Sequence, residues 1–166
     1  TSQDMNRKIF YIFFLAFFCF FQQISAQDDC EIPNEFSGNT GVNMTVMLTP
    51  DAISLFPNLV EGAYVVAIGN NSGIVVGSQP VYGVTQTSLA VWGDDTSTSD
   101  VVDGAESNET LIYYLVNGNE LYDIEFQWGG SDGSSYVTSG ISAALGANVT
   151  FNCSPPASGC MDSLAC

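Results

Sequence analysis

Short apolar runs separated by Gly, Asn, Asp and Ser make up the chain between Val42 and Phe151. No stretch of about 11 residues has a convincing helical period. Residues 42–49 instead place an apolar side chain at every second position, which is typical of a strand with one buried face. The predicted strands are 42–48, 63–68, 74–78, 86–92, 110–116, 121–128, 136–138 and 147–151. Many short strands with turn residues between them predict an all-β fold, namely an antiparallel β-sandwich of Ig-like or jelly-roll type.

Turn residues support two hairpins within this pattern. Residues 70–73, Asn-Asn-Ser-Gly, separate the second and third predicted strands. Asn117-Gly118 lies between two apolar runs, and such a pair is a strong hairpin signal because both residues tolerate positive φ. The helix candidate is 50–59, one or two turns long, with Pro50 in the first helical position after Thr49.

The first 26 residues have the organisation of a secretory signal peptide. Arg7 and Lys8 precede the apolar run 9–21, and residues 22–27 contain the small residues of a cleavage site. The apolar run is too short for a bilayer, which needs about 20 residues. We therefore expect a signal peptide over 5–26, with Met5 as the initiator and residues 1–4 as upstream read-through. The β-sandwich domain then covers 27–153, followed by a linker over 154–159.

Cleavage after Ala26 would leave a chain without any Lys, Arg or His. Of the 18 acidic residues only Asp4 would be lost, so the mature side-chain charge is −17, against −16 for the whole chain. Nucleic acids and anionic membranes attract basic side chains, so neither partner is expected, nor is membrane insertion of the mature chain. Catalytic triads, Schiff-base lysines and histidine metal sites each lack a required residue. We therefore expect a protein that is not an enzyme.

Four cysteines remain beyond the signal peptide, and an even number in an exported chain predicts disulfides. Cys30 and Cys153 flank the apolar-patterned region. Of the three pairings, the preferred one joins these two and joins Cys160 to Cys166. A crosslink that closes about 120 residues stabilises by roughly 4 to 5 kcal/mol in the chain-entropy model. A metal site is disfavoured because no Cys-x-x-Cys motif or histidine accompanies these cysteines.

Residues 159–166 read Gly-Cys-Met-Asp-Ser-Leu-Ala-Cys. They resemble the opening of the Gly-Cys-x-Asp-x-x-Ala-Cys repeats of large exported proteins of Bacteroidetes-type bacteria, so 160–166 is expected to be a truncated Cys-rich repeat. An uncharacterised β-domain of the same proteins is similar to segments 61–67, 73–78, 89–95 and 103–105. The resemblance implies a secreted or cell-surface location, further domains of the same polypeptide, and a role in adhesion or in presenting partner domains. It implies no active site.

An acidic loop between two predicted strands is the candidate metal site. The loop, residues 93–109, holds six carboxylates, of which the candidate ligands are Asp94, Asp95, Asp100, Asp103 and Glu106. Calcium takes six to eight oxygen ligands, which such a loop could supply, but the spacing is not that of an EF-hand. A solvated acidic loop is favoured over a calcium site. Clustered carboxylates are also found in hydrolases such as glycosidases and aspartic proteases, so a carboxylate-based hydrolase is a weaker alternative.

Aromatic side chains are the candidates for ligand stacking. Trp92 and one of the pair Tyr113 and Tyr114 are expected in the core, where large aromatics of a sandwich pack. Trp128, beside two glycines, and Tyr136 are the candidate ligand-binding residues, because exposed Trp and Tyr are enriched at interfaces.

These observations predict a secreted or cell-surface, non-catalytic structural or adhesive module of a larger protein. Its partner would be a surface polysaccharide or another protein. The alternative is a carbohydrate-binding module, with or without Ca²⁺. Apart from Ca²⁺, no cofactor is expected.

Overall fold

The computed structural model describes residues 30–95, 97–98 and 101–155. Its elements, in chain order, are β1 (Asn43–Leu48), α2 (Pro50–Ile53), β2 (Tyr64–Gly69), β3 (Val75–Pro80), β4 (Thr87–Trp92), β5 (Leu111–Asn117), β6 (Glu120–Gly129) and β7 (Ile141–Cys153). The fold is all-β, as predicted. Several predictions lie outside the described residues: residues 1–4, the signal peptide 5–26, Asp100, most of the linker, and the repeat 160–166 with Cys160 and Cys166.

The strands form one continuous sheet in the order β3-β2-β5-β6-β7-β1-β4. The sheet is mixed, because β1 and β7 run parallel while the other neighbours are antiparallel. The prediction of two antiparallel sheets was therefore wrong. The physical reason is the length of β7, which begins at Ile141 and not near Ala147. Residues 141–144 pair with β1 and residues 143–153 pair with β6, so a single strand connects both halves into one sheet.

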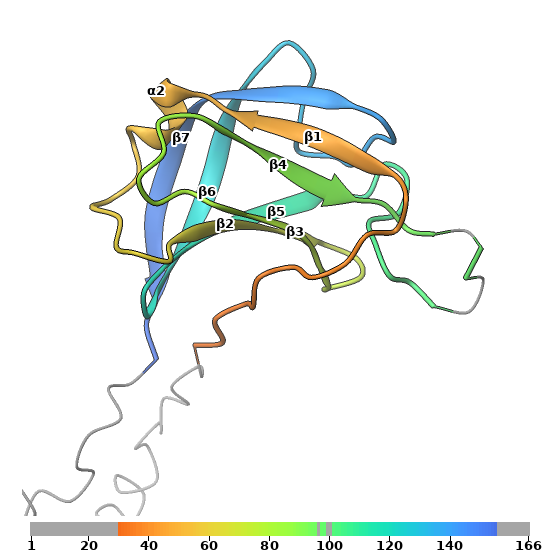
Figure 1. Cartoon of the computed structure of the whole chain (residues 1–166), viewed down its shortest axis with the longest axis horizontal. Helices are drawn as coiled ribbons and strands as arrows, with labels where there is room; N and C mark the ends of the chain where they lie inside the picture. Colours follow the sequence, from red (N-terminus) through yellow and green to blue (C-terminus); the bar gives the residue numbers. More distant parts are fainter. Residues whose placement is uncertain (1–29, 96, 99–100, 156–166) are drawn as a thin grey trace, which may run out of the picture.

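The sheet curls until it is nearly a barrel, and its two edge strands, β3 and β4, come together (Figure 1). Gly77 of β3 makes this approach possible. A Cβ atom at Gly77 would lie 2.2 Å from the carbonyl oxygen of Ala90 in β4. The strand backbones can therefore meet only where a side chain is missing.

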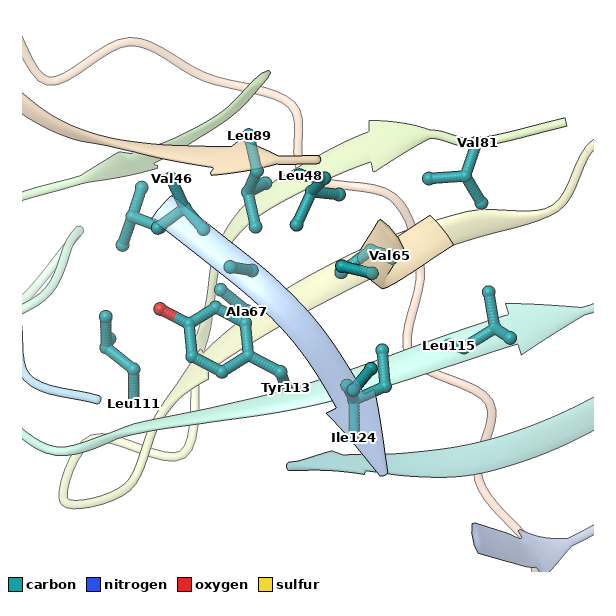
Figure 2. Close-up of a cluster of buried hydrophobic side chains, with 14 of the residues drawn as sticks. Val46, Leu48, Val65, Ala67, Val81, Leu89, Leu111, Tyr113, Leu115 and Ile124 are labelled. Atoms are coloured by element: carbon teal, nitrogen blue, oxygen red, sulfur yellow. The ribbon is translucent and has the colours of Figure 1, made fainter. Parts of the chain in front are cut away.

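The main core fills the inside of this curled sheet. Alternate residues of β1, Met44, Val46 and Leu48, are buried, as the sequence pattern predicts. Figure 2 shows how side chains from five strands and from the segment after β3 converge in the interior: Val46, Leu48, Val65, Ala67, Val81, Leu89, Leu111, Tyr113, Leu115 and Ile124. Tyr113 is the buried member of the pair Tyr113 and Tyr114, and Trp92 is only half-buried.

A smaller apolar cluster lies on the outer face of β2, β5 and β6. Its buried members are Val66, Val116 and Leu121. The N-terminal segment, residues 30–41, runs along this face in an extended conformation (Figure 1). A disulfide between Cys30 and Cys153 joins the two ends of the domain across 123 residues, in agreement with the preferred pairing.

Turns and the short helix depart from the prediction in instructive ways. Thr49 caps α2 as expected, but the helix ends at Ile53, before Pro57, and does not extend to residue 59. Asn117 pairs with Glu120 and belongs to β5, so the turn residues are Gly118, at φ 64°, and Asn119. Asn117 is buried because its side chain accepts from the Val60 amide (2.8 Å) and donates to the Asn58 carbonyl (3.0 Å).

The predicted strand 136–138 was wrong. An isolated bridge between Thr110 and Ser135 takes its place, and Tyr136 is held in a loop by two backbone hydrogen bonds.

Candidate functional site

The acidic loop that follows β4 is closed by its own carboxylates. Asp94 accepts a hydrogen bond from the Asp103 amide through Oδ1, and Asp103 accepts one from the Asp95 amide through Oδ1, each at 3.0 Å. The backbone reinforces this closure, because Gly93 forms a parallel bridge with Ala105. Each of the two carboxylates therefore bonds to the backbone on the opposite side of the loop base, and together they close the loop.

Asp95 has a different, local role. Its side chain accepts a hydrogen bond from the Ser97 amide, two residues further along the chain, at 2.9 Å. This contact is an Asx-turn. This backbone hydrogen bond, helped by the Ser97 side chain, lowers the pKa of Asp95.

A calcium site in this loop stays a prediction. Glu106 is exposed, and Asp100 lies outside the described residues. Within the described ranges, no three His, Cys, Asp or Glu side chains are grouped so that they could hold a metal ion. Asp94, Asp95 and Asp103 each accept a hydrogen bond from a backbone amide.

Glu109, which the sequence analysis did not single out, is the most completely buried carboxylate described here, with 3 % of its surface exposed. Its Oε1 accepts from the amides of Asn71 and Ser72 (2.9 Å each) and from the Ser72 hydroxyl (3.1 Å). Its Oε2 accepts from the Glu106 amide at 2.9 Å. One side chain thus connects the β2–β3 turn to the segment that leads into β5.

The protonation of Glu109 depends on a balance of two effects. Burial raises the pKa of this carboxyl group, but the hydrogen bonds from Ser72, Glu106 and Asn71 outweigh burial, so the pKa lies below its ordinary value of 4.5. Gly69 provides the space, since a Cβ atom there would lie 2.4 Å from Ser72 Oγ and 2.6 Å from Glu109 Oε1. No sequence signal marks Glu109, because its donors are backbone amides.

The two predicted stacking residues are largely covered. Tyr136 is 2 % exposed and belongs to the core, so its ring cannot stack on a ligand at the surface. Its hydroxyl lies against Gly93 and is the one buried side-chain polar atom in the described chain without a hydrogen-bond partner. Trp128 is half-buried: its ring contacts Tyr113 and Phe126, with centroids 5.7 and 5.4 Å away, and Gly133 lies on it.

The aromatic cluster around Trp128 stabilises the adjoining loop. Tyr113 contacts Phe126 edge to face, with ring centroids 5.2 Å apart, and its hydroxyl donates to the Gly133 carbonyl at 2.6 Å. Burial, with a smaller contribution from the Asp132 carboxylate, raises the pKa of Tyr113 far above its ordinary value. This hydroxyl therefore stays protonated and acts as a donor. We interpret the cluster as structural.

A groove of about 680 Å³ lies between the N-terminal segment and the outer face of the sheet. Its floor is apolar and aromatic, formed by Ile68, Val75, Tyr114 and Leu121. Its wall is the segment 31–37 with Glu31, Asn34 and Glu35, and Asn152 of β7 completes it. No local sequence pattern marks this site, because its two sides come from distant parts of the chain.

Three contacts position the wall of the groove. The Tyr64 hydroxyl donates to the Pro33 carbonyl at 2.5 Å, and the Phe36 amide donates to the Ser78 hydroxyl at 2.9 Å. The Cys30–Cys153 disulfide anchors its start. These contacts hold the N-terminal segment against the sheet, so the groove is a defined part of the fold.

Comparisons with family models, curated proteins and solved structures give no match to this chain. The part of the chain that the structure describes includes no helix with the length and apolar character of a transmembrane span.

Proposed function

We propose that this chain is a secreted or cell-surface module with a structural or adhesive role in a larger protein, and that it is not an enzyme. The observation that carries the proposal is the Cys30–Cys153 disulfide, which joins the two ends of the β-domain. Disulfides of this kind form and persist in oxidising compartments outside the cytosol. Joined ends also suit a module within a longer chain, because neighbouring segments then leave from one place.

The chemistry of the described carboxylates supports a non-catalytic role. Asp94, Asp103 and Glu109 each accept hydrogen bonds from backbone amides that close or connect loops. A carboxylate with such hydrogen bonds holds a loop in place. This structural role accounts for these three acidic residues, and no catalytic role is needed to explain them. An adhesive role is further supported by the groove, which offers an apolar floor beside carboxylate and amide groups.

The carbohydrate-binding alternative, with or without calcium, depended on stacking by Trp128 and Tyr136. Burial of Tyr136 and coverage of Trp128 by Gly133 remove the observation that favoured it at these residues. We therefore place the adhesive role, toward a surface polysaccharide or a protein, ahead of it.

Export and thiol state test the proposal together. The full chain would be expressed in a bacterial host, beside a variant in which Arg7 and Lys8 are replaced by Glu. We expect the unchanged chain outside the cytoplasm, with Cys30 and Cys153 resistant to thiol alkylation, and the variant inside with reactive thiols. Beads coated with the exported protein should then adhere to bacterial surfaces.

Two results would overturn the proposal. One is a cytoplasmic protein with free thiols at Cys30 and Cys153. The other is hydrolysis of a polysaccharide or peptide by the purified chain that disappears in Asp94→Asn or Asp103→Asn. A Glu61→Gln variant, which changes an exposed carboxylate away from the acidic loop, serves as the control for the second measurement.

A further inference from the structure

The groove beneath the N-terminal segment has an apolar floor, and the charged residues that line it are acidic. Glu31 and Glu35 line the wall. Asp123 lies beside the floor as the cross-strand partner of Tyr114, and it accepts a hydrogen bond from the Asn152 side chain at 2.9 Å. Burial, and to a smaller extent the Asp123 carboxylate, raises the pKa of Tyr114 above its ordinary value.

None of the residues that the structure describes is a cation that could neutralise this site, because the sequence contains no Lys, Arg or His after Lys8. Within the described residues, the carboxylates of the groove therefore have only solvent and external cations as charged partners. Because a concave surface lined by one sign of charge concentrates the opposite sign, the site favours a positively charged ligand.

The size and the shape of the groove favour a chain segment over a small ion. About 680 Å³ is within the range of sites that hold several side chains. The floor residues Ile68, Val75 and Leu121 would contact apolar side chains, while Glu31 and Glu35 at the wall would contact basic ones. An extended peptide presents these two kinds of side chain on opposite faces, since successive residues of a strand alternate.

We propose that this groove binds an extended, lysine- or arginine-bearing apolar segment of a partner protein. The inference rests on the proposed adhesive role and names its partner class. Basic side chains of the segment pair with Glu31 and Glu35, its apolar side chains cover the floor, and Asn34 and Asn152 are available to its backbone groups. Binding of this kind weakens with added salt, because the charge pairs lie at the rim.

Fluorescence anisotropy with a labelled pentapeptide of alternating lysine and leucine tests the site on the full, oxidised chain. The decisive variant is Glu31→Gln with Glu35→Gln. Its matched control is Glu61→Gln with Glu106→Gln, which removes the same charge from two exposed side chains outside the groove. We expect roughly 10-fold weaker binding for the groove variant and less than about 2-fold for the control.

A floor variant, Tyr114→Ala, should weaken binding of the peptide without any change in net charge. Far-UV circular dichroism and the urea midpoint would show that each variant is folded. Equal losses in both charge variants would overturn the inference, because they would indicate attraction to the whole acidic surface. Tight binding of a neutral oligosaccharide such as xylohexaose, without competition by the peptide, would overturn it as well.

The outcomes also separate this inference from the proposed function. If the Glu31/Glu35 variant is exported and its beads adhere as well as the unchanged protein, the proposed function stands and the groove is not its binding site. If the unchanged chain is neither exported nor adhesive, the proposed function fails whatever the peptide does.

Discussion

Glu109 and Asp94 belong to the same acidic stretch of sequence, yet the structure uses them differently. Glu109 is almost fully buried and accepts four hydrogen bonds, three of them from backbone amides. Asp94 is half-buried and accepts one, from the Asp103 amide. Neither has a cationic partner among the described residues, because the sequence contains no Lys, Arg or His after Lys8. The difference shows that a carboxylate can be buried without a basic side chain beside it once enough backbone donors surround it.

The comparison predicts its largest effect for Glu109→Ala. This change leaves the amides of Asn71, Ser72 and Glu106 without their acceptor, and buried donors without a partner are costly. We expect the free energy of unfolding to fall by about 3 kcal/mol in urea titrations. Glu106→Ala, at an exposed side chain in the same stretch, should change it by less than about 0.5 kcal/mol. Similar effects of the two changes would contradict the connecting role of Glu109.

Gly69→Ala should have the next largest effect, because its new Cβ atom would collide with Ser72 Oγ and Glu109 Oε1. We expect a loss of about 2 kcal/mol in the same urea measurement. The double variant Gly69→Ala with Glu109→Ala provides the control, since removal of the carboxylate relieves part of the collision. The loss of stability in the double variant should therefore be smaller than the sum of the losses in the two single variants. Strict additivity would indicate that these two positions are not in contact.

Acid should destabilise the protein in part through Glu109. A carboxyl group with a lowered pKa in the folded state contributes stability above its unfolded pKa, near 4.5, and this contribution is lost as pH falls through the folded value. We expect urea midpoints that decrease below about pH 4.5. Glu109→Gln should be less stable at neutral pH and should show a shallower decrease. An equally steep decrease in this variant would assign the acid sensitivity to other carboxylates.

Asp103→Asn, in the same acidic stretch, should have a smaller effect than the changes at Glu109 and Gly69. The carboxamide oxygen can still accept from the Asp95 amide, and the site is partly open to water. We expect a loss of less than about 1 kcal/mol. Equal losses for Asp103→Asn and Glu109→Gln would contradict the distinction between a half-buried carboxylate that closes a loop and a buried one that connects two segments.

Much of the local structure could be predicted from residue patterns. Alternation over 42–48 predicted β1, and Asn-Asn-Ser-Gly predicted the turn between β2 and β3. These signals are local, since side-chain periodicity and turn chemistry act within a few residues. The strand predicted over 136–138 failed because Tyr136 is buried by contacts from a loop, where its apolar character says nothing about backbone conformation.

The candidate sites were less predictable. Composition indicated Asp94 and Asp103 as candidate ligands, but it did not indicate that Glu109 would be the buried carboxylate or that Tyr114 would line a groove. Glu109 depends on amides from a turn some 37 residues away in the chain, and Tyr114 depends on an N-terminal segment that covers its strand. Contacts between segments so far apart in the sequence cannot be predicted from a short motif.

Residue patterns were enough to establish the β character of the chain and the positions of most strands, and composition excludes side-chain salt bridges among the residues after Lys8. The cysteine positions also indicated that Cys30 and Cys153 flank one domain. The folded arrangement was needed to show that β7 pairs with β1 in parallel, that the sheet curls to bring β3 against β4, and that Glu109 is the buried carboxylate. Periodicity and turn residues are local properties, whereas strand partners and burial depend on which distant segments meet.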